Sequence, residues 1–318
     1  MPQKSNALLY LALTRTPTHV GCGQGLDDID LPLKRNVVTG LPEWPGSGIK
    51  GVWREHAPAQ WELSPELVTK LFGPPRDTAA LHAGMLMPQD AHLLALPVAS
   101  QCGGWGWATS VVVLQRMRRE ALALGLQGLP DLPARLVEPN GQSQQAAYLA
   151  AGSPLRLPAE AGGLVVLGEL ALSVSAQDAA AQDLCAQWGR WLAQAACPDD
   201  DEAWRQHMAR RLVVVDDDSF EHLARMHLEV RSRVSLGEGR VADEHALWRE
   251  ECLPADTVMW GLVAAQRVPQ HGLEEAHALA HVKACRMQLG GKASVGYGWV
   301  EFWPQDAAPT AQTEGGKL

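Results

Sequence analysis

The chain has 318 residues, 46% of them hydrophobic and 20% charged, which is the balance of a water-soluble globular protein long enough to bury a substantial core. It begins without the basic, apolar and small-residue order of a secretory leader, and no apolar run reaches the ~20 residues of a membrane helix, so we expect a cytoplasmic protein without membrane contact. A net charge of −9 disfavours nucleic acid as a partner, but the basic residues cluster locally, so a basic groove on an acidic body stays compatible with the sequence.

The N-terminal part predicts a strand, a long loop and two helices. Residues 7–14 are apolar on both alternating faces, which indicates a strand buried on both sides. The irregular segment 15–45 is rich in Gly, Pro and Asp, and a loop of this length is typically functional or mobile. A Gly-rich turn then opens a helix over 46–56. A short helix over 64–71 follows, with Ser64 as its N-cap.

The middle of the chain predicts alternating strands and helices around an inserted region. The span of about 125–221 is insertion-rich, and its segment 125–163 is dominated by Gln, Pro, Gly, Leu and Ala. Four elements are expected here: a strand and turn over 84–96, an extended and then helical segment over 110–124, a strand over 163–173, and an Ala-rich helix over 176–196.

The C-terminal part predicts a hairpin, two strands and one helix. The hairpin covers about 226–241 and turns at Gly237-Glu238-Gly239. Strands are expected over 257–265 and 299–303, and the residues after 305 form a flexible tail. One apolar helical stripe runs through Leu273, Ala276, Ala280, Ala284 and Met287.

This order of elements favours an α+β fold with a ferredoxin-like βαββαβ core. Strand, turn and helix at the start, then strand, helix, turn and strand at the end, supply its six elements. The sequence therefore predicts a single domain over 1–304 that carries insertions, followed by a tail over 305–318.

An acidic, Gly-rich cluster lies in the first long loop. Gly21, Gly23 and Gly25 allow a close approach between this backbone and another one. They precede three aspartates, Asp27, Asp28 and Asp30, which could hold Mg²⁺ or supply a general base. A solvated acidic turn explains the same residues about equally well, since Asp is a favoured turn residue.

Two further Gly-rich segments are candidates for binding phosphate. Residues 46–54 place backbone N–H groups, Lys50 and Arg54 at a helix start, where the helix dipole favours anions. Residues 288–298 form a second Gly-rich loop, which does not have the spacing of a Walker A motif. An ordinary loop-to-helix junction and a tight turn are the alternatives.

These stretches together resemble the repeated backbone subunit of the type III-B (Cmr) CRISPR effector complex, in the RAMP superfamily. The matching segments occur in the family's order. They are Pro17–Gly23 with Asp30–Pro32 and Arg35, Thr39–Pro42 with Pro45–Gly51 and Arg54, Leu71–Pro74, Asp90–Leu94 with Pro97–Ser100, Leu247–Pro254, and Gln288–Gly291.

The resemblance implies an RRM-like palm with a protruding hairpin thumb, repeated along a CRISPR guide RNA (crRNA) that pairs with a target RNA. By this resemblance Asp30 matches the catalytic aspartate, with a divalent cation such as Mg²⁺ as its expected cofactor, and His19, Asp27 and Asp28 are accessory candidates. Guide-binding positions would be Gly46, Ser47, Lys50, Arg54, Arg35, Gly290, Gly291 and Lys292. Thumb positions would be Arg231, Arg233, Val234, Leu236 and Arg240.

The same resemblance implies further copies of the chain and other Cmr subunits as partners, including a small helical one. The 292–297 loop departs from the family, because Tyr297 replaces a usual lysine. Two other functions are open: a structural RNA-binding protomer that does not cut, and a stand-alone phosphoester enzyme with metal-binding aspartates.

Overall fold

Strand β1 (Ala7–Thr14) occupies the centre of the fold because its two neighbours bury it along its length. It pairs antiparallel with β12 (Val258–Ala265) on one side and with β14 (Trp299–Gln305) on the other. Residues 9–13 are at most 1% exposed. Opposite Tyr10 stands Gly261, where a Cβ would lie 2.4 Å from the Tyr10 hydroxyl oxygen, so glycine makes room for the phenol. The buried strand predicted over 7–14 is confirmed.

The computed structural model describes residues 6–25, 28–74, 82–132, 146–158, 163–174, 179–236 and 242–305, without the side chains of 235–246. Its main sheet is mixed, with the order β13-β14-β1-β12-β4-β5-β9-β6-β8-β7, while β2 pairs with β4 and β3 with β12. The other strands are β2 (Glu43–Trp44), β3 (Leu86–Pro88), β4 (Ala91–Ser100), β5 (Gly104–Ser110), β6 (Ala146–Leu149), β7 (Leu164–Leu167), β8 (Leu170–Val174), β9 (Leu212–Val215) and β13 (Cys285–Gln288).

Helix α1 (Gly46–Gln60) covers one face of this sheet. Its buried Trp53 contacts Tyr10 of β1 and Phe302 of β14, with ring centroids 5.3 and 5.6 Å apart. Such edge-to-face contacts bury large apolar area in a defined geometry. Helix α2 (Pro65–Phe72) follows, and its Ser64 hydroxyl oxygen accepts the Leu67 N–H at 3.3 Å, as the predicted N-cap requires.

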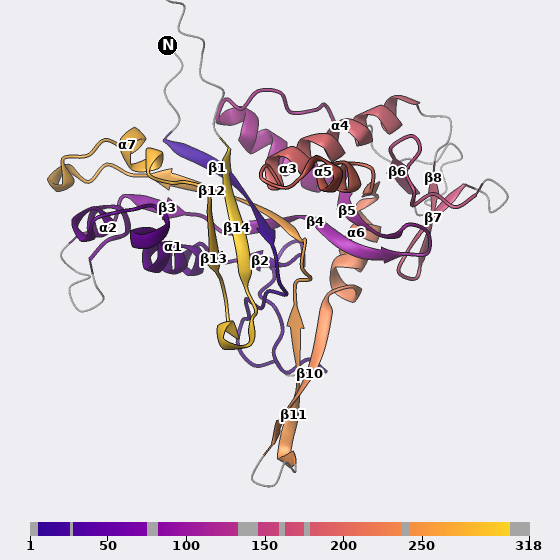
Figure 1. The fold of residues 1–318 in the computed structure, drawn as a ribbon, viewed down its shortest axis with the longest axis horizontal. Helices are drawn as coiled ribbons and strands as arrows, with labels where there is room; N and C mark the ends of the chain where they lie inside the picture. Colours follow the sequence, from indigo (N-terminus) through magenta and orange to yellow (C-terminus); the bar gives the residue numbers. More distant parts are fainter. Residues whose placement is uncertain are drawn as a thin grey trace, which may run out of the picture.

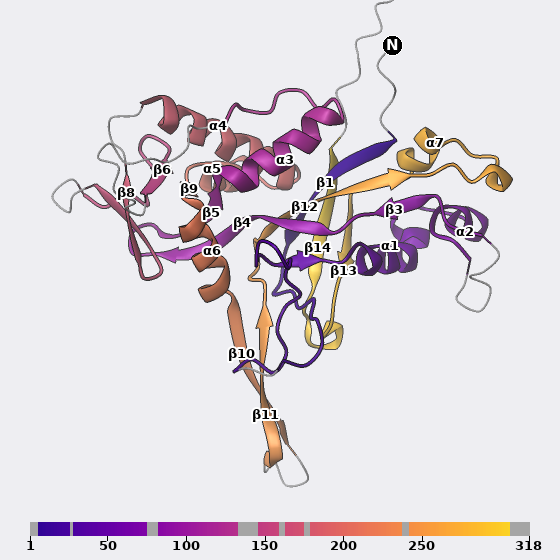
Figure 2. The same cartoon turned by 180° about the vertical axis from the view of Figure 1, so that it is seen from behind.

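Of the remaining helices, α3 to α6 gather toward the other end of the sheet, while α7 lies at the end of α1 and α2, as Figures 1 and 2 show from two sides. Helix α4 (Ala179–Ala196) contacts β1 and β14, while α3 (Val111–Ala123) contacts β4 and β5. The others are α5 (Glu202–Ala209), α6 (Asp217–Met226), α7 (Glu275–Ala280) and the 3₁₀ turns Pro269–His271 and Ala293–Val295. Among the described helices, none has the length and apolarity needed to cross a membrane.

A two-stranded hairpin projects from the body of the molecule (Figure 1). It consists of β10 (Glu229–Leu236) and β11 (Ala242–Cys252), paired antiparallel in a sheet of their own. The predicted hairpin over 226–241 is therefore wrong in its limits. Met226 ends α6, and the second strand continues to Cys252, where it pairs with Glu229 at the start of β10.

Two other predictions are corrected. The strand expected over 163–173 is the pair β7 and β8, because Gly168 adopts φ 57° and turns the chain between them. The helix expected through Met287 ends at Ala280. Cys285 and Met287 are buried with an exposed residue between them, which is the alternation of a strand, and β13 pairs with β14.

The insertion-rich span continues the main sheet. Strand β9 adds parallel to β5, and β6, β8 and β7 follow outward. The structure thus has a mixed α+β fold, within which this span forms regular elements between its undescribed residues. The predicted tail after 305 lies outside the described residues.

Candidate nucleic-acid interface

Asp30 lies exposed where the first long loop meets the base of the hairpin. Its carboxylate Oδ2 accepts the backbone N–H of Arg249 at 2.7 Å. The next residue forms a parallel bridge with β11, because the Leu31 N–H donates to the Arg249 carbonyl at 3.0 Å and its own carbonyl accepts the Glu251 N–H at 3.0 Å. The hairpin base therefore fixes the backbone beside Asp30 and leaves its carboxylate accessible.

His19 connects the same loop to two other segments. Its ring is buried, and Nδ1 lies 2.7 Å from the carbonyl oxygen of Glu251. A carbonyl oxygen only accepts, so Nδ1 carries the proton of this hydrogen bond. The His19 carbonyl in turn accepts the Gly291 N–H at 2.9 Å. These contacts give the predicted accessory His19 a structural role in joining the loops.

Of the other two acidic candidates, the structure describes only Asp28, and it does not form a three-ligand cluster with Asp30. Asp28 is exposed, and Asp27 lies outside the described residues. Among the residues that the structure describes, no three His, Cys, Asp or Glu side chains converge on one point. The donors that are present therefore fit only a cation whose further ligands come from RNA or water, in the way that Mg²⁺ binds through one carboxylate and substrate phosphates.

The loop 289–298 approaches this region through glycine. Gly290 has φ 89°, and a Cβ there would lie 2.3 Å from the His19 carbonyl oxygen. Only glycine accepts both this conformation and this approach at low cost. The predicted RNA-binding residues Gly290 and Gly291 thus bring two protein segments together. Lys292, also predicted, follows with φ 66°.

Two of the predicted thumb arginines, Arg231 and Arg233, lie at the hairpin base, on the side of this loop. Arg233 pairs with Glu250, a fully buried carboxylate whose Oε2 also lies 3.4 Å from Lys292 Nζ. Arg231 donates to the Tyr297 hydroxyl at 2.9 Å, and both guanidinium carbons lie 4.9 Å from the centre of the Tyr297 ring. These charges hold the hairpin on the loop 289–298.

The apolar hairpin positions face outward. Val234 is 49% exposed and stands directly opposite Leu247, which is 67% exposed. Arg240 and the side chain of Leu236 lie outside the described residues. An exposed apolar pair next to a fixed base is a surface available to a partner.

Arg35 is held inside the protein. Its guanidinium donates to Glu251 Oε1 at 2.7 Å and to the carbonyls of Gly40 and Ala224 at 3.1 and 3.2 Å. Glu251 Oε2 accepts the Leu33 N–H at 2.9 Å. Arg35 therefore clamps the first loop between β11 and α6.

The start of α1 contacts a different part of the fold. The Gly46 N–H donates to Asp90 Oδ1 at 2.7 Å, and Ser47 and Gly48 are exposed. Arg54 donates to the Pro74 carbonyl at 2.9 Å. The Lys50 ammonium has no hydrogen bond or ion pair with a described residue, and burial together with nearby Arg54 lowers its pKa. Lys50 is the predicted cation most available to a phosphate.

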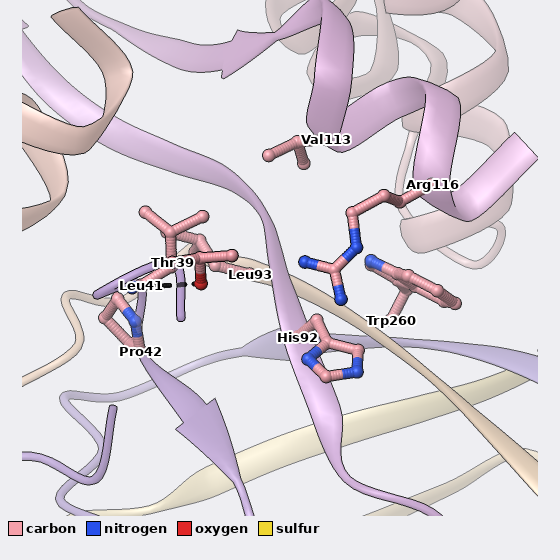
Figure 3. Close-up of a pocket in the computed structure, with 8 residues that line it drawn as sticks. All are labelled: Thr39, Leu41, Pro42, His92, Leu93, Val113, Arg116 and Trp260. Atoms are coloured by element: carbon pink, nitrogen blue, oxygen red, sulfur yellow. Dashed lines mark hydrogen bonds between the residues drawn. The ribbon is translucent and has the colours of Figure 1, made fainter. Parts of the chain in front are cut away.

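A small recess separates α3 from the loop that leads to α1. Figure 3 shows Arg116 reaching from α3 toward His92 of β4 and Trp260 of β12. The enclosed volume of about 10 Å³ has room for one water molecule. The recess is too small for a nucleotide.

The structure thus brings Asp30, His19, Gly290, Gly291, Lys292 and the hairpin arginines to one hub, while Gly46, Ser47, Lys50 and Arg54 belong to α1. Sequence reasoning assigned no role to Glu250, Glu251 and Tyr297, which organise this hub. The signal in the sequence was the adjacent pair Glu250 and Glu251. Neighbouring side chains in a strand point to opposite faces, so the two carboxylates reach different partners.

Comparisons with known proteins identify the family. The chain is 26% identical over 302 residues to the CRISPR system Cmr endoribonuclease Cmr4 of Pyrococcus furiosus, covering 93% of this chain and 94% of that protein. The crystal structure of oligomeric Cmr4 from P. furiosus superposes with a TM-score of 0.68 at 22% identity, covering 94% of this chain and 97% of that one. A chain in a cryo-EM structure of the type III-B Cmr-beta complex bound to cognate target RNA gives 0.67 at 16% identity, with coverage of 95% and 98%. The RAMP superfamily profile matches residues 12–301, and the chain belongs to the RAMP superfamily.

Proposed function

We propose that this chain is the backbone subunit of a type III-B CRISPR complex. Copies of it polymerise along the crRNA in the cytoplasm and cut the paired target RNA at regular intervals. The relative of 26% identity across 93% of the chain, whose name is that of an endoribonuclease, supports this function. The observation that carries it is an accessible Asp30 carboxylate, held by backbone contacts at the base of a projecting hairpin.

The fold suggests which parts bind RNA. Strands β14, β1, β12 and β4 are antiparallel neighbours, and α1 and α7 lie on the connections β1 to β4 and β12 to β14. We interpret these elements as a ferredoxin-like, RRM-like palm. The hairpin β10–β11 would be its thumb.

Cleavage follows from distortion of the RNA. A regular A-form duplex aligns each 2′-OH poorly with its own phosphodiester. If the thumb displaces one target nucleotide, the 2′-oxygen can attack the adjacent phosphorus in line. Asp30 takes the 2′-OH proton, a P–O bond forms to the 2′-oxygen, and the bond to the 5′-oxygen breaks. That oxygen leaves with a proton from water.

We propose that the guide strand binds at the start of α1 and at the loop 289–298. Lys50 offers an unpaired ammonium beside the exposed Ser47 at a helix start, which suits a phosphate. Arg54, Arg35 and Lys292 remain candidates, although each already has a partner within the protein. Gly290 and Gly291 contribute by positioning the loop.

We propose that a divalent cation at this site is bound jointly by this chain and by the RNA. Its charge would offset that of the cleaved phosphate, and the free oxygen of Asp30 is the donor that this chain offers. Chelation by EDTA should then abolish cleavage, and added Mg²⁺ or Mn²⁺ should restore it. Undiminished cleavage in EDTA would remove the cation from the proposal.

The decisive experiment compares Asp30→Asn with Asp28→Asn. Each variant is assembled with crRNA and the other Cmr subunits, including the small helical one, and given a labelled target. Loss of a general base should slow cleavage by about 10²- to 10⁴-fold with target binding unchanged, whereas Asp28→Asn should cut normally. Normal cutting by Asp30→Asn would contradict the catalytic assignment. Absence of cutting by the unmodified complex would favour a non-catalytic RNA-binding protomer.

A further inference from the structure

Helix α3 presents an exposed stripe on the face opposite its buried side. Val112, Gln115, Arg119 and Leu122 are exposed and follow one another at intervals of three and four residues, so they lie on one helical face. Val112 and Leu122, at its two ends, are each 46% exposed. The stripe therefore has apolar ends and a polar, basic middle.

A groove runs along this stripe. Its volume is about 430 Å³, and Arg116, Arg118 and Leu132 complete its lining. Three arginines and three aliphatic residues thus line one open space. Among the described residues, no carboxylate belongs to the lining, although the chain as a whole has a net charge of −9.

The cations of the groove are available to a ligand. Arg116 has no hydrogen bond or ion pair with any residue in the described part of the chain. Burial and Arg116 itself lower the pKa of nearby His92, which favours the neutral ring and so adds no second positive charge beside the guanidinium (Figure 3). Farther along, Arg119 is 73% exposed and pairs only with the adjacent Glu120.

The third guanidinium also has an exchangeable partner. Arg118 donates through Nε to the Pro130 carbonyl at 2.8 Å, and its outer nitrogen pairs with Asp131, which is 84% exposed. Ion pairs at such exposed positions contribute little to stability, so carboxylates of a ligand can replace Asp131 and Glu120 at small cost.

We propose that this α3 groove is the docking site for an acidic amphipathic helix of a partner protein. Carboxylates of that helix would pair with the arginines, and its apolar side chains would cover Val112 and Leu122, as when a helix lies in a groove. A phosphate backbone would use the arginines but leave the two aliphatic ends in water. The inference is independent of the proposed cleavage activity.

The test uses the full chain assembled with crRNA. The ligand is a labelled helical peptide of roughly 18 residues, about 27 Å long, with Leu along one face and Glu beside it. Fluorescence anisotropy should give affinities about tenfold weaker for Arg119→Glu and for Leu122→Ser. The control Arg210→Glu, an exposed arginine at the end of α5, should change affinity by less than about twofold. Target cleavage should be unaffected by all three substitutions.

Two results would overturn the docking site. The first is equal peptide affinity for all three variants, or equal binding of a peptide whose Leu residues are replaced by Ser. The second is competition by single-stranded RNA that Arg119→Glu weakens and Leu122→Ser does not, because the groove would then hold phosphate. Melting temperatures of the variants establish that each is folded.

Discussion

A predicted RNA-binding side chain is available to RNA when its charge has no partner within the described part of the protein. Arg35, Arg231 and Arg233 are already engaged with Glu251, Tyr297 and Glu250. Lys50 is half-buried with no counter-ion in the described residues, so its charge is uncompensated until an anion arrives. Guide affinity should therefore depend more on this lysine than on the arginines.

Lys50→Gln should weaken crRNA binding about equally for all sequences. Loss of one phosphate contact should reduce the slope of log affinity against log salt by about 0.7 for a single strand. Filter binding at several salt concentrations measures this slope. Arg35→Gln is the comparison, since it should lower stability and leave the slope unchanged. Equal slopes for Lys50→Gln and the unmodified chain would contradict the assignment.

Alanine substitutions at two glycines should distinguish the free-energy cost of a left-handed backbone from the cost of a steric contact. Gly290 and Gly296 have nearly equal φ, 89° and 87°, but only Gly290 approaches another backbone, that of His19. Gly296→Ala should cost the left-handed conformation alone, about 1 kcal/mol. Gly290→Ala should cost about 2 kcal/mol more, because the 2.3 Å contact with the His19 carbonyl must be relieved. Urea denaturation of both variants measures the difference, and equal losses would refute the close approach.

At the scale of elements, the sequence predicted those helices and strands that depend on interactions between residues close together in the chain. β1 is apolar on both faces and α2 has its Ser64 cap, so both were predictable from adjacent residues. Strand β13 was not predictable in this way, because the spacing of Leu273, Ala276, Ala280 and Ala284 before it continues one apolar helical face. Its pairing with β14 overrides that tendency, and such pairing is not visible in the sequence.

The same distinction applies to the candidate site. The resemblance predicted Asp30 in the first loop as catalytic and Gly290 and Gly291 as guide-binding residues, and the structure joins these two loops through His19. The hairpin limits and the opposite directions of Glu250 and Glu251 depend on the register of β10 with β11. Register is set by three-dimensional packing, so these partners could not be assigned from one sequence.

Tyr297 should control how firmly the hairpin is held. Tyr297→Leu removes the buried ring under the partly exposed Arg231 and Arg233, a cation–π contribution of about 0.5–2 kcal/mol for each. Hydrogen exchange of the amides of β10 should then become faster. Tyr297→Phe keeps the ring and loses only the hydroxyl contact with Arg231, so its exchange should lie between the two. Identical exchange in all three proteins would show that the ring does not hold the hairpin.

At the scale of the molecule, buried thiols give stability a dependence on alkaline pH. Burial raises the pKa of Cys185, Cys197, Cys252 and Cys285 to about 12. Above the unfolded value of about 8.5, the unfolded chain loses these protons and the folded chain keeps them. The folded state then binds more protons, so the free energy of unfolding falls as pH rises toward 12.

Cys185→Ala should remove one of these contributions, up to about 1.4 kcal/mol per pH unit. Urea denaturation at several pH values between 8 and 11 gives the slope, with exposed Cys22→Ala as the control that leaves it unchanged. A slope that Cys185→Ala does not alter would mean that this thiol ionises equally in both states.

The position of β1 also bears on how the protein is made. Both strands that flank it come from the last fifth of the chain, and the first of them, β12, begins roughly 240 residues after β1 ends. At ~5–20 residues per second, a ribosome needs about 12–50 s to deliver the first of them. During that interval an apolar strand has two unpaired edges, which is a template for aggregation. A holdase chaperone that shields the nascent chain should therefore raise the yield of folded protein.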